Sequence, residues 1–239
     1  VFLGTRWEMT KVDLRSESPQ RYKTFVDEYG ENPQSLLLTL GWSRDSRDNV
    51  LAPTRGRYQR LSGEVSVPGL DTQYYRATYQ ITQYLPITNS WTLGLNAQVG
   101  YGDTYGNDKI FPFFKNFYAG GIGSVRGYES SSLGPKDVNG DNLGGTEQLV
   151  FSAELLTPLP GADRTLRGLL FLDGGNVWGY SAQSGQSNHM DFNDLRYSWG
   201  VGVAWISPLG PLKFSIAFPL NDKDGDDTQR FQFQIGTGF

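Results

Sequence analysis

The sequence predicts an all-β protein, an antiparallel transmembrane β-barrel with about ten strands. Apolar residues recur at every second position over much of the chain, which is the period of a β-strand. Glycine and aromatic residues are frequent, with 30 glycines and 14% aromatic residues among 239, and this composition suits strands and turns better than helices. Long polar connections mostly alternate with short proline-bearing ones, as in outer-membrane barrels.

The clearest alternation predicts strands over 35–43, 91–101, 197–205, 212–218 and 231–239. Weaker alternation predicts five more, near 1–12, 55–67, 74–85, 147–157 and 166–178. Most of these segments approach the roughly 9–11 residues that cross a bilayer at a tilt. No amphipathic helix of useful length is predicted.

The two faces of these strands favour a membrane barrel over a soluble sandwich, whose apolar faces would pack together inside. Aromatic residues stand at strand ends, for example Trp91 and Tyr101, as in the interfacial girdles of outer-membrane barrels. The opposite face carries mainly Gly, Ser, Gln and Asn. We therefore expect the apolar face to contact lipid and the small polar face to line the interior.

The connections indicate which end of the barrel faces outward, because outer-membrane barrels have long outer loops and short periplasmic turns. The long segments are 13–34, 104–146, 179–196 and 220–229, and the short ones are 86–90, 158–165 and 207–211. Two connections depart from this rule. Segment 67–73 is short although it lies at the end that carries the long loops, and segment 47–54 is somewhat long although it lies at the end that carries the short turns. If 1–12 runs outward, ten strands return the C-terminus to the periplasm.

Composition excludes several classes of function. The absence of cysteine excludes disulfides, thiolate metal sites and a cysteine nucleophile. A net charge of −4 offers no basic footprint for nucleic acid. Segments 137–142 and 221–229 lack the offsets of a calcium loop, and His189 near Ser187 and Asp191 is interpreted as a polar loop residue. We predict no catalytic residue, no metal site and no enzyme activity.

The segment 117–136, FYAGGIGSVRGYESSSLGPK, resembles the inner loop of the BamA family of outer-membrane barrel-assembly proteins. Its core is the motif Val125-Arg126-Gly127-Tyr128. Further stretches resemble the same family in the same order, and they are 51–69, 152–160, 169–178 and 206–239. The similarity covers nearly the whole chain, and the ordered set is far more specific than the four-residue motif.

The resemblance implies a barrel of about sixteen strands in the cell outer membrane, preceded by periplasmic POTRA domains. Residues 1–239 would be its C-terminal part, roughly strands seven to sixteen. The complete protein would fold and insert β-barrel proteins without ATP or a cofactor. Its expected partners are unfolded outer-membrane proteins, accessory lipoproteins and the lipid bilayer. A two-partner secretion transporter that exports a large adhesin or haemolysin is the alternative, and the number of POTRA domains would discriminate.

Arg126 poses a physical problem, because a buried guanidinium without partners is very costly. The alternation predicts that Glu154 and Asp173 point inward from their strands. In the family, the matching acids bind the loop arginine. We hypothesise that loop 104–146 folds into the barrel and that these two acids hold Arg126 there. The alternative is a solvated loop arginine.

The terminal strand, 230–239, alternates Phe231, Phe233 and Phe239 with polar or small residues and resembles the β-signal of barrel-assembly clients. Gly236 and Gly238 weaken the end of this strand. In the family, this end meets the first strand at a seam that opens laterally, and client strands pair with the exposed edge. The alternative is that the glycines simply fit a crowded interior.

Overall fold

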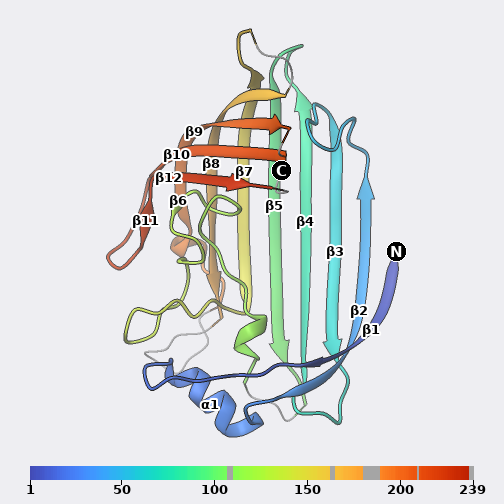
Figure 1. Cartoon of the computed structure of the whole chain (residues 1–239), viewed down its shortest axis with the longest axis vertical. Coiled ribbons are helices and arrows are strands. Elements are labelled where there is room, and N and C mark those ends of the chain that lie inside the picture. The colour runs from blue at the N-terminus through green and yellow to red at the C-terminus, as the bar shows by residue number, and fades with distance from the viewer. Residues whose placement is uncertain (107–109, 162–164, 180–188, 209, 237–239) are drawn as a thin grey trace.

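The computed structural model describes residues 1–106, 110–161, 165–179, 189–208 and 210–236. Its main element is one antiparallel sheet of ten strands in the order β1-β2-β3-β4-β5-β7-β8-β9-β10-β12 (Figure 1). The strands are β1 (Phe2–Met9), β2 (Gln34–Asp45), β3 (Gly56–Ser66), β4 (Tyr74–Pro86), β5 (Thr92–Thr104), β7 (Glu147–Pro158), β8 (Leu166–Trp178), β9 (Arg196–Ser207), β10 (Gly210–Pro219) and β12 (Phe231–Ile235). The predicted all-β class and the number of strands are confirmed.

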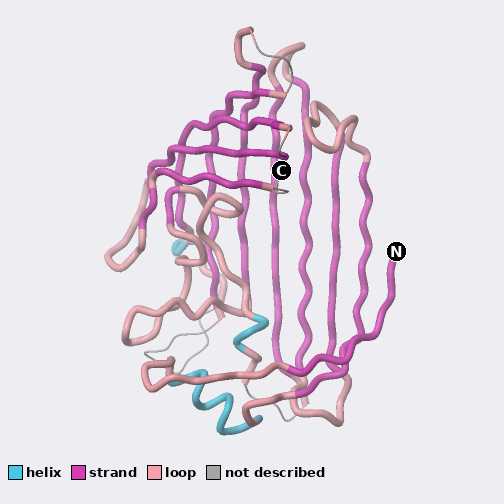
Figure 2. The backbone as a smooth tube through the Cα atoms, in the orientation of Figure 1, coloured by secondary structure: helices cyan, strands magenta, loops and turns pink. Residues whose placement is uncertain are grey.

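The sheet is strongly curved, and its concave face encloses a long connection. β9, β10 and β12 cross in front of the middle strands, and the loop between β5 and β7 runs through the space enclosed (Figures 1 and 2). β1 and β12 are the two edges, and they are not paired with each other in the part of the chain that is described. The curvature brings segments distant in sequence within reach of the same interior.

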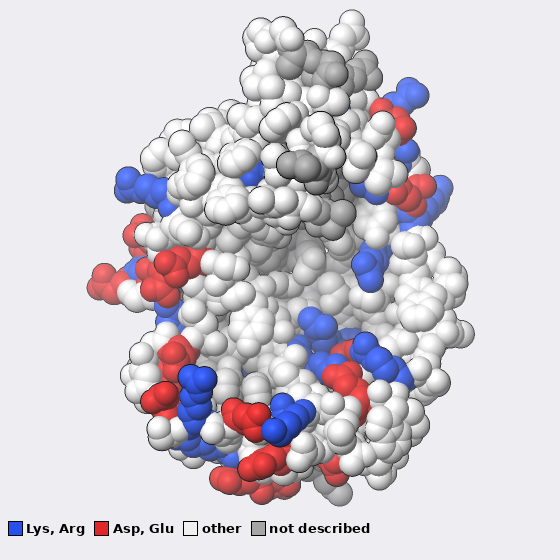
Figure 3. Space-filling view, viewed as in Figure 1, with Lys and Arg blue, Asp and Glu red and all other residues white. Residues whose placement is uncertain are grey.

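The convex face is apolar and exposed. Leu172 lies opposite Trp199, which lies opposite Phe218, and the last two rings stack with centroids 5.2 Å apart. Exposed apolar residues on this face also include Leu38, Leu40, Leu95, Val99, Leu170, Val201, Phe214 and Ile216. The surface over β9, β10 and β12 carries few charges (Figure 3). This is the arrangement expected for lipid contact, and no dry core between two sheets forms among the described residues.

The concave face combines polar side chains with a buried apolar cluster that includes Tyr84, Leu156 and Phe171, and it has glycines where the enclosed loop approaches. A Cβ atom at Gly100 would lie 2.5 Å from the ring of Phe117, and one at Gly102 would lie 2.9 Å from that of Phe111. Both phenylalanines belong to the loop and are buried. The glycines of β5 therefore leave room for aromatic side chains that arrive from the loop.

The structure contains a helix that the sequence pattern did not predict. α1 (Gln20–Tyr29) lies within segment 13–34, and its Phe25 packs edge-on against Phe113 and Phe114, with centroids 5.5 and 5.7 Å away. Phe113 begins the 3-10 helix η1 (Phe113–Lys115). Only Arg21 and Phe25 are buried in α1, so its apolar stripe is too sparse to give a helical period. Within the described residues, no helix has the length and apolar character needed to cross a membrane.

The remaining short elements connect the loops. β6 (Gly127–Tyr128) pairs with β11 (Thr228–Gln229), and the 3-10 helix η2 (Phe192–Asp194) precedes β9. Within the predicted terminal strand 230–239, β12 ends at Ile235, and Gly236 adopts a φ of 102°, which breaks the strand. Phe239 lies outside the described residues.

Candidate functional site

Arg126 lies inside the curved sheet and is only 2% exposed. Its Nε and Nη2 atoms donate to the two carboxylate oxygens of Asp173 on β8, at 2.7 and 2.6 Å. The backbone N–H of Arg126 donates to the same carboxylate at 3.0 Å. Its Nη1 atom lies 2.6 Å from Oε1 of Glu154 on β7. The structure thus brings the three residues together, and we call Arg126, Glu154 and Asp173 the latch.

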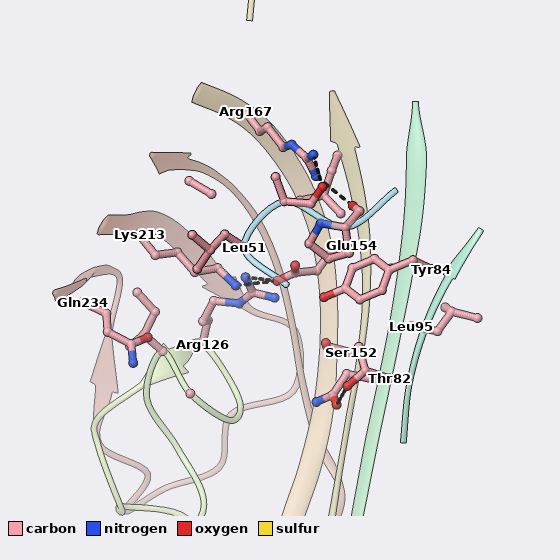
Figure 4. Close-up of a pocket in the computed structure, with 18 of the residues that line it drawn as sticks. Leu51, Thr82, Tyr84, Leu95, Arg126, Ser152, Glu154, Arg167, Lys213 and Gln234 are labelled. Atoms are coloured by element: carbon pink, nitrogen blue, oxygen red, sulfur yellow. Dashed lines mark hydrogen bonds and ion pairs between the residues drawn. The ribbon is translucent and has the colours of Figure 1, made fainter. Parts of the chain in front are cut away.

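Two further residues complete the surroundings of the latch. The guanidinium of Arg126 lies over the ring of Phe171, 3.5 Å from its centroid. Lys213 of β10 places Nζ 2.8 Å from the Glu154 carboxylate, so Glu154 lies between two cations (Figure 4). Lys213 was missed in the sequence, although the alternation in 212–218 places it on the inner face as its single charged residue. Two cations and two acids balance the charge.

The geometry explains why the latch holds strongly. Asp173 is fully buried and receives three donors from Arg126. A bidentate arginine–carboxylate pair is strong and directional. Removing one member of such a buried group would leave an uncompensated charge in a poorly hydrated interior. The arrangement is suited to holding the loop in one position.

The neighbouring motif residues shape the loop around the latch. Val125 and Tyr128 are buried, and the Val125 side chain packs against β8, where a Cβ atom at Gly175 would be 3.0 Å from it. Gly127 has a φ of 93°, and a Cβ atom there would lie 3.3 Å from Ala217 on β10. Glycine is therefore required where the loop passes β10, because the backbone there has a positive φ and there is little room for a side chain.

The loop makes a second set of contacts with the end of the chain, which the sequence did not indicate. Gln232 of β12 donates through Nε2 to the carbonyl of Tyr128 at 2.6 Å. The backbone N–H of Glu129 donates to the carbonyl of Asp227 at 2.9 Å, and Lys136 reaches the Asp227 carboxylate at 2.6 Å. We call these bonds, together with the β6–β11 pairing, the terminal hairpin contact.

Of the predicted seam residues, Phe231 and Phe233 lie on β12, Gly236 follows the end of that strand, and Phe239 is outside the described residues. β12 pairs with β10 through one edge, and its other edge has no strand partner within the described residues. Phe231 and Phe233 are 57% and 59% exposed on the outer face, while Gln232 points inward. Gly236 donates its N–H to the carbonyl of Pro211 at 2.9 Å. β12 pairs with β10 over five residue pairs, whereas β10 pairs with β9 over ten, so the terminal strand is the more weakly held of the two neighbours of β10.

Comparison with known proteins places the chain in a family. All residues from 1 to 239 match the family model of the Omp85 superfamily domain. The chain belongs to the Omp85 superfamily.

Relatives of this Omp85 domain include named assembly factors. It is 42% identical to outer membrane protein assembly factor BamA of Neisseria meningitidis serogroup B, over 100% of this chain and 34% of the relative. It is 30% identical to a SAM50-like protein of Schizosaccharomyces pombe, over 86% of this chain and 44% of that protein. The crystal structure of BamA from Haemophilus ducreyi lacking POTRA domains 1–3 matches with a TM-score of 0.82 and 26% identity.

The solved structure is matched over 97% of this chain and 49% of its own length. The chain thus spans about a third of the Neisseria relative and about half of the solved chain. The predicted BamA-like family and outer-membrane location are confirmed, and the ten strands of the Omp85 domain form part of an outer-membrane barrel.

A cavity of about 230 Å³ lies beside the latch in this Omp85 domain. It is bounded by the loop tip at Ile122–Ser124, by the inner wall, and by Leu51–Pro53 from the connection between β2 and β3 (Figure 4). Arg167 of β8 holds that connection by donating to the carbonyls of Pro53 and Ala52 at 2.9 and 2.8 Å. The extra length of segment 47–54 therefore lets it fold over the interior.

The weaker sequence candidates do not form a site in the described residues. Ser187 lies outside them, and His189 instead contacts Glu147, with Nδ1 3.0 Å from Oε1. This hydrogen bond raises the pKa of His189 above its usual value. In the calcium-loop candidate 221–229, Asp226 forms an ion pair with Arg196 of β9. No group of three or more potential metal ligands is found among the described residues.

Proposed function

We propose that this Omp85 domain is the C-terminal part of the barrel of an outer-membrane assembly factor, with residues 104–146 as its inner loop and 230–239 as its terminal strand. The complete protein folds β-barrel proteins and inserts them into the outer membrane through a lateral seam at β12. The observation that carries this proposal is the weak pairing of the terminal strand: β12 pairs with β10 only over Phe231–Ile235 and ends where Gly236 takes a φ of 102°. An exposed edge can accept a client strand through main-chain hydrogen bonds, which makes few demands on client sequence.

In this proposal, the latch fixes the position of the inner loop. It holds the inner loop against β7 and β8, and the loop in turn contacts β12 through Gln232. The loop then serves as a rigid inner support beside a weak edge. The seam can open while the rest of the wall keeps its shape.

The proposed activity uses no catalytic residue and no cofactor, because it lowers a kinetic barrier to insertion. Its partners are unfolded outer-membrane proteins, accessory lipoproteins and the bilayer. A two-partner secretion transporter shares the loop motif and the aromatic terminal strand. The Neisseria relative is named an outer membrane protein assembly factor, which favours assembly over secretion.

A reversible cross-link tests the seam in the full-length protein. Ile235→Cys, beside Gly236, would be combined with a second introduced cysteine in the strand that faces β12 in the complete barrel. Oxidation would join the two cysteines by a disulfide. We expect insertion of client barrels to stop on oxidation and to recover on reduction. The matched control joins Phe214→Cys to Val203→Cys, which face each other across β10 and β9. Full insertion activity with the seam locked would overturn the proposal.

A further inference from the structure

The hairpin of β2 and β3 carries arginines on the membrane-facing side of the sheet. Arg44 lies opposite Gln59, and Arg57 lies opposite Gln83, in the same outward rows as the exposed Leu40 and Leu95. Arg44 and Arg57 are both exposed, as is Arg55 next to the start of β3. Diagonal neighbours on one face of an antiparallel pair are about 7–8 Å apart, so Arg44 and Arg57 can reach one anion together.

Arg57 is held in a fixed orientation. Its Nε atom donates to Oε1 of Gln83 at 2.6 Å. The amide of Gln83 in turn donates to the carbonyls of Gly56 and Tyr84 at 3.0 and 3.2 Å. This chain of bonds uses one donor of Arg57, and its two terminal nitrogens form no hydrogen bond or ion pair among the described residues.

The acids of the hairpin are already occupied. Both carboxylate oxygens of Asp45 bind Arg47, at 2.9 and 2.6 Å. Asp48 accepts from the hydroxyl and N–H of Thr54 and from the N–H of Arg55. Within the described residues, neither Arg44 nor Arg57 forms an ion pair. Charged side chains gather at the edge of the molecule beside this connection (Figure 3).

The apolar residues beside Arg44 and Arg57 favour a lipid over a soluble anion as the ligand. Leu38, Leu40 and Leu61 continue the same outward face toward the middle of the sheet and are exposed. Trp42 lies opposite Leu61 and between Leu40 and Arg44 along β2. Tryptophan followed by arginine at the end of an apolar face is the pattern of a membrane interface. The turn 87–90 at the same end has no charged residue, so the cluster is local.

We propose that Arg44 and Arg57 bind the phosphate of an anionic phospholipid in the leaflet that the short turns face, while Leu40 and Leu61 contact its acyl chain. Guanidinium groups bind phosphate through paired donors, and the acyl chain provides the apolar contact that a free anion lacks. The site anchors this side of the barrel at a fixed depth in the bilayer. It lies away from the seam and adds a lipid-binding role to the domain.

Lipid retention by the full-length protein tests this site. Native mass spectrometry would count phosphatidylglycerol and phosphatidylcholine of equal acyl composition that remain bound in detergent. In the variant R44Q/R57Q we expect the preference for phosphatidylglycerol to fall about twenty-five-fold, the product of about fivefold for each arginine near the surface. The variant R44K/R57K should lose less, because it keeps the charge but not the paired donors.

The matched control removes the same charge at the opposite end of the barrel. Lys11 and Arg15 are exposed in the long loop before α1, and K11Q/R15Q should retain the wild-type preference. Retention of phosphatidylglycerol by R44Q/R57Q at the wild-type level would overturn the proposal. Displacement of phosphatidylglycerol by millimolar inorganic phosphate would also overturn it, because the site would then be a general anion site. Client insertion should be unchanged in R44Q/R57Q.

Discussion

The inner loop is attached to the barrel at two places that differ in kind. At the latch, a guanidinium that is 2% exposed contacts two acids, one of them fully buried, on the central strands β7 and β8. At the terminal hairpin contact, the bonds involve backbone groups, one amide side chain and the partly exposed pair of Lys136 and Asp227.

This difference shows that the loop is held firmly on the side of the central strands β7 and β8 and weakly on the side of the edge strand β12. Buried charged groups that lose a partner cost several times more than a single neutral hydrogen bond. Solvent screens the Lys136–Asp227 pair, so it contributes little. A weak attachment at β12 is compatible with an edge that opens while the loop stays in place.

The largest expected effect comes from breaking the latch. Arg126→Ala leaves Asp173 fully buried without the two guanidinium donors, and we expect a loss of about 3–5 kcal/mol in the free energy of unfolding. Thermal unfolding in detergent and proteolysis of loop 104–146 would measure it. The control Arg15→Ala in an exposed loop should change stability by less than about 0.5 kcal/mol. Unchanged melting and loop protection in Arg126→Ala would contradict the latch.

A second test acts on the fit of the loop rather than on its charges. Gly100→Ala would place a Cβ atom 2.5 Å from the buried ring of Phe117, which Arg76 covers with its guanidinium 4.1 Å from the ring centroid. We expect overpacking to cost about 1–3 kcal/mol in unfolding free energy. Gly123→Ala is the matched control, since a Cβ atom at Gly123 would meet no other atom within 4 Å. Equal melting temperatures for the two variants would show that the glycines of β5 do not make room for the loop.

A smaller effect is expected at the terminal hairpin contact. Gln232→Ala removes the donor to the carbonyl of Tyr128 and should cost about 0.5–1.5 kcal/mol. Amide hydrogen exchange should accelerate in β11 and β12, while the loop around Arg126 stays protected. Gln234→Ala, on the same inner face, provides the comparison. If exchange around Arg126 rose as much as in β12, the two attachments would be one cooperative unit.

The smallest effect concerns pH. The hydrogen bond to Glu147 raises the pKa of His189 above its usual value, so the protonated form is favoured in the folded state. Its stabilisation is complete below the unfolded-state pKa and is lost as pH rises through the folded-state pKa. The melting temperature of the wild type should therefore fall slightly between about pH 6 and pH 8 relative to that of His189→Gln. A difference of the opposite sign would exclude this interaction in solution.

Much of the fold could be predicted because each strand carries its own signal. The period of two assigned the strands and their two faces, and the same parity placed Glu154 and Asp173 on the interior side. Helix α1 could not be predicted, since its packing partners Phe113 and Phe114 are about ninety residues away in the sequence. Only one of its rings is buried, too few to mark a helical stripe.

The sequence by itself determined which residues face lipid and which face the interior, because side chains alternate along any strand regardless of what surrounds it. The tertiary structure alone decided which interior residues meet. The curvature of the sheet carries β10 and β12 over the loop, so that Lys213 reaches Glu154 and Gln232 reaches Tyr128. These contacts depend on register and curvature summed over many strands, and no local segment encodes them.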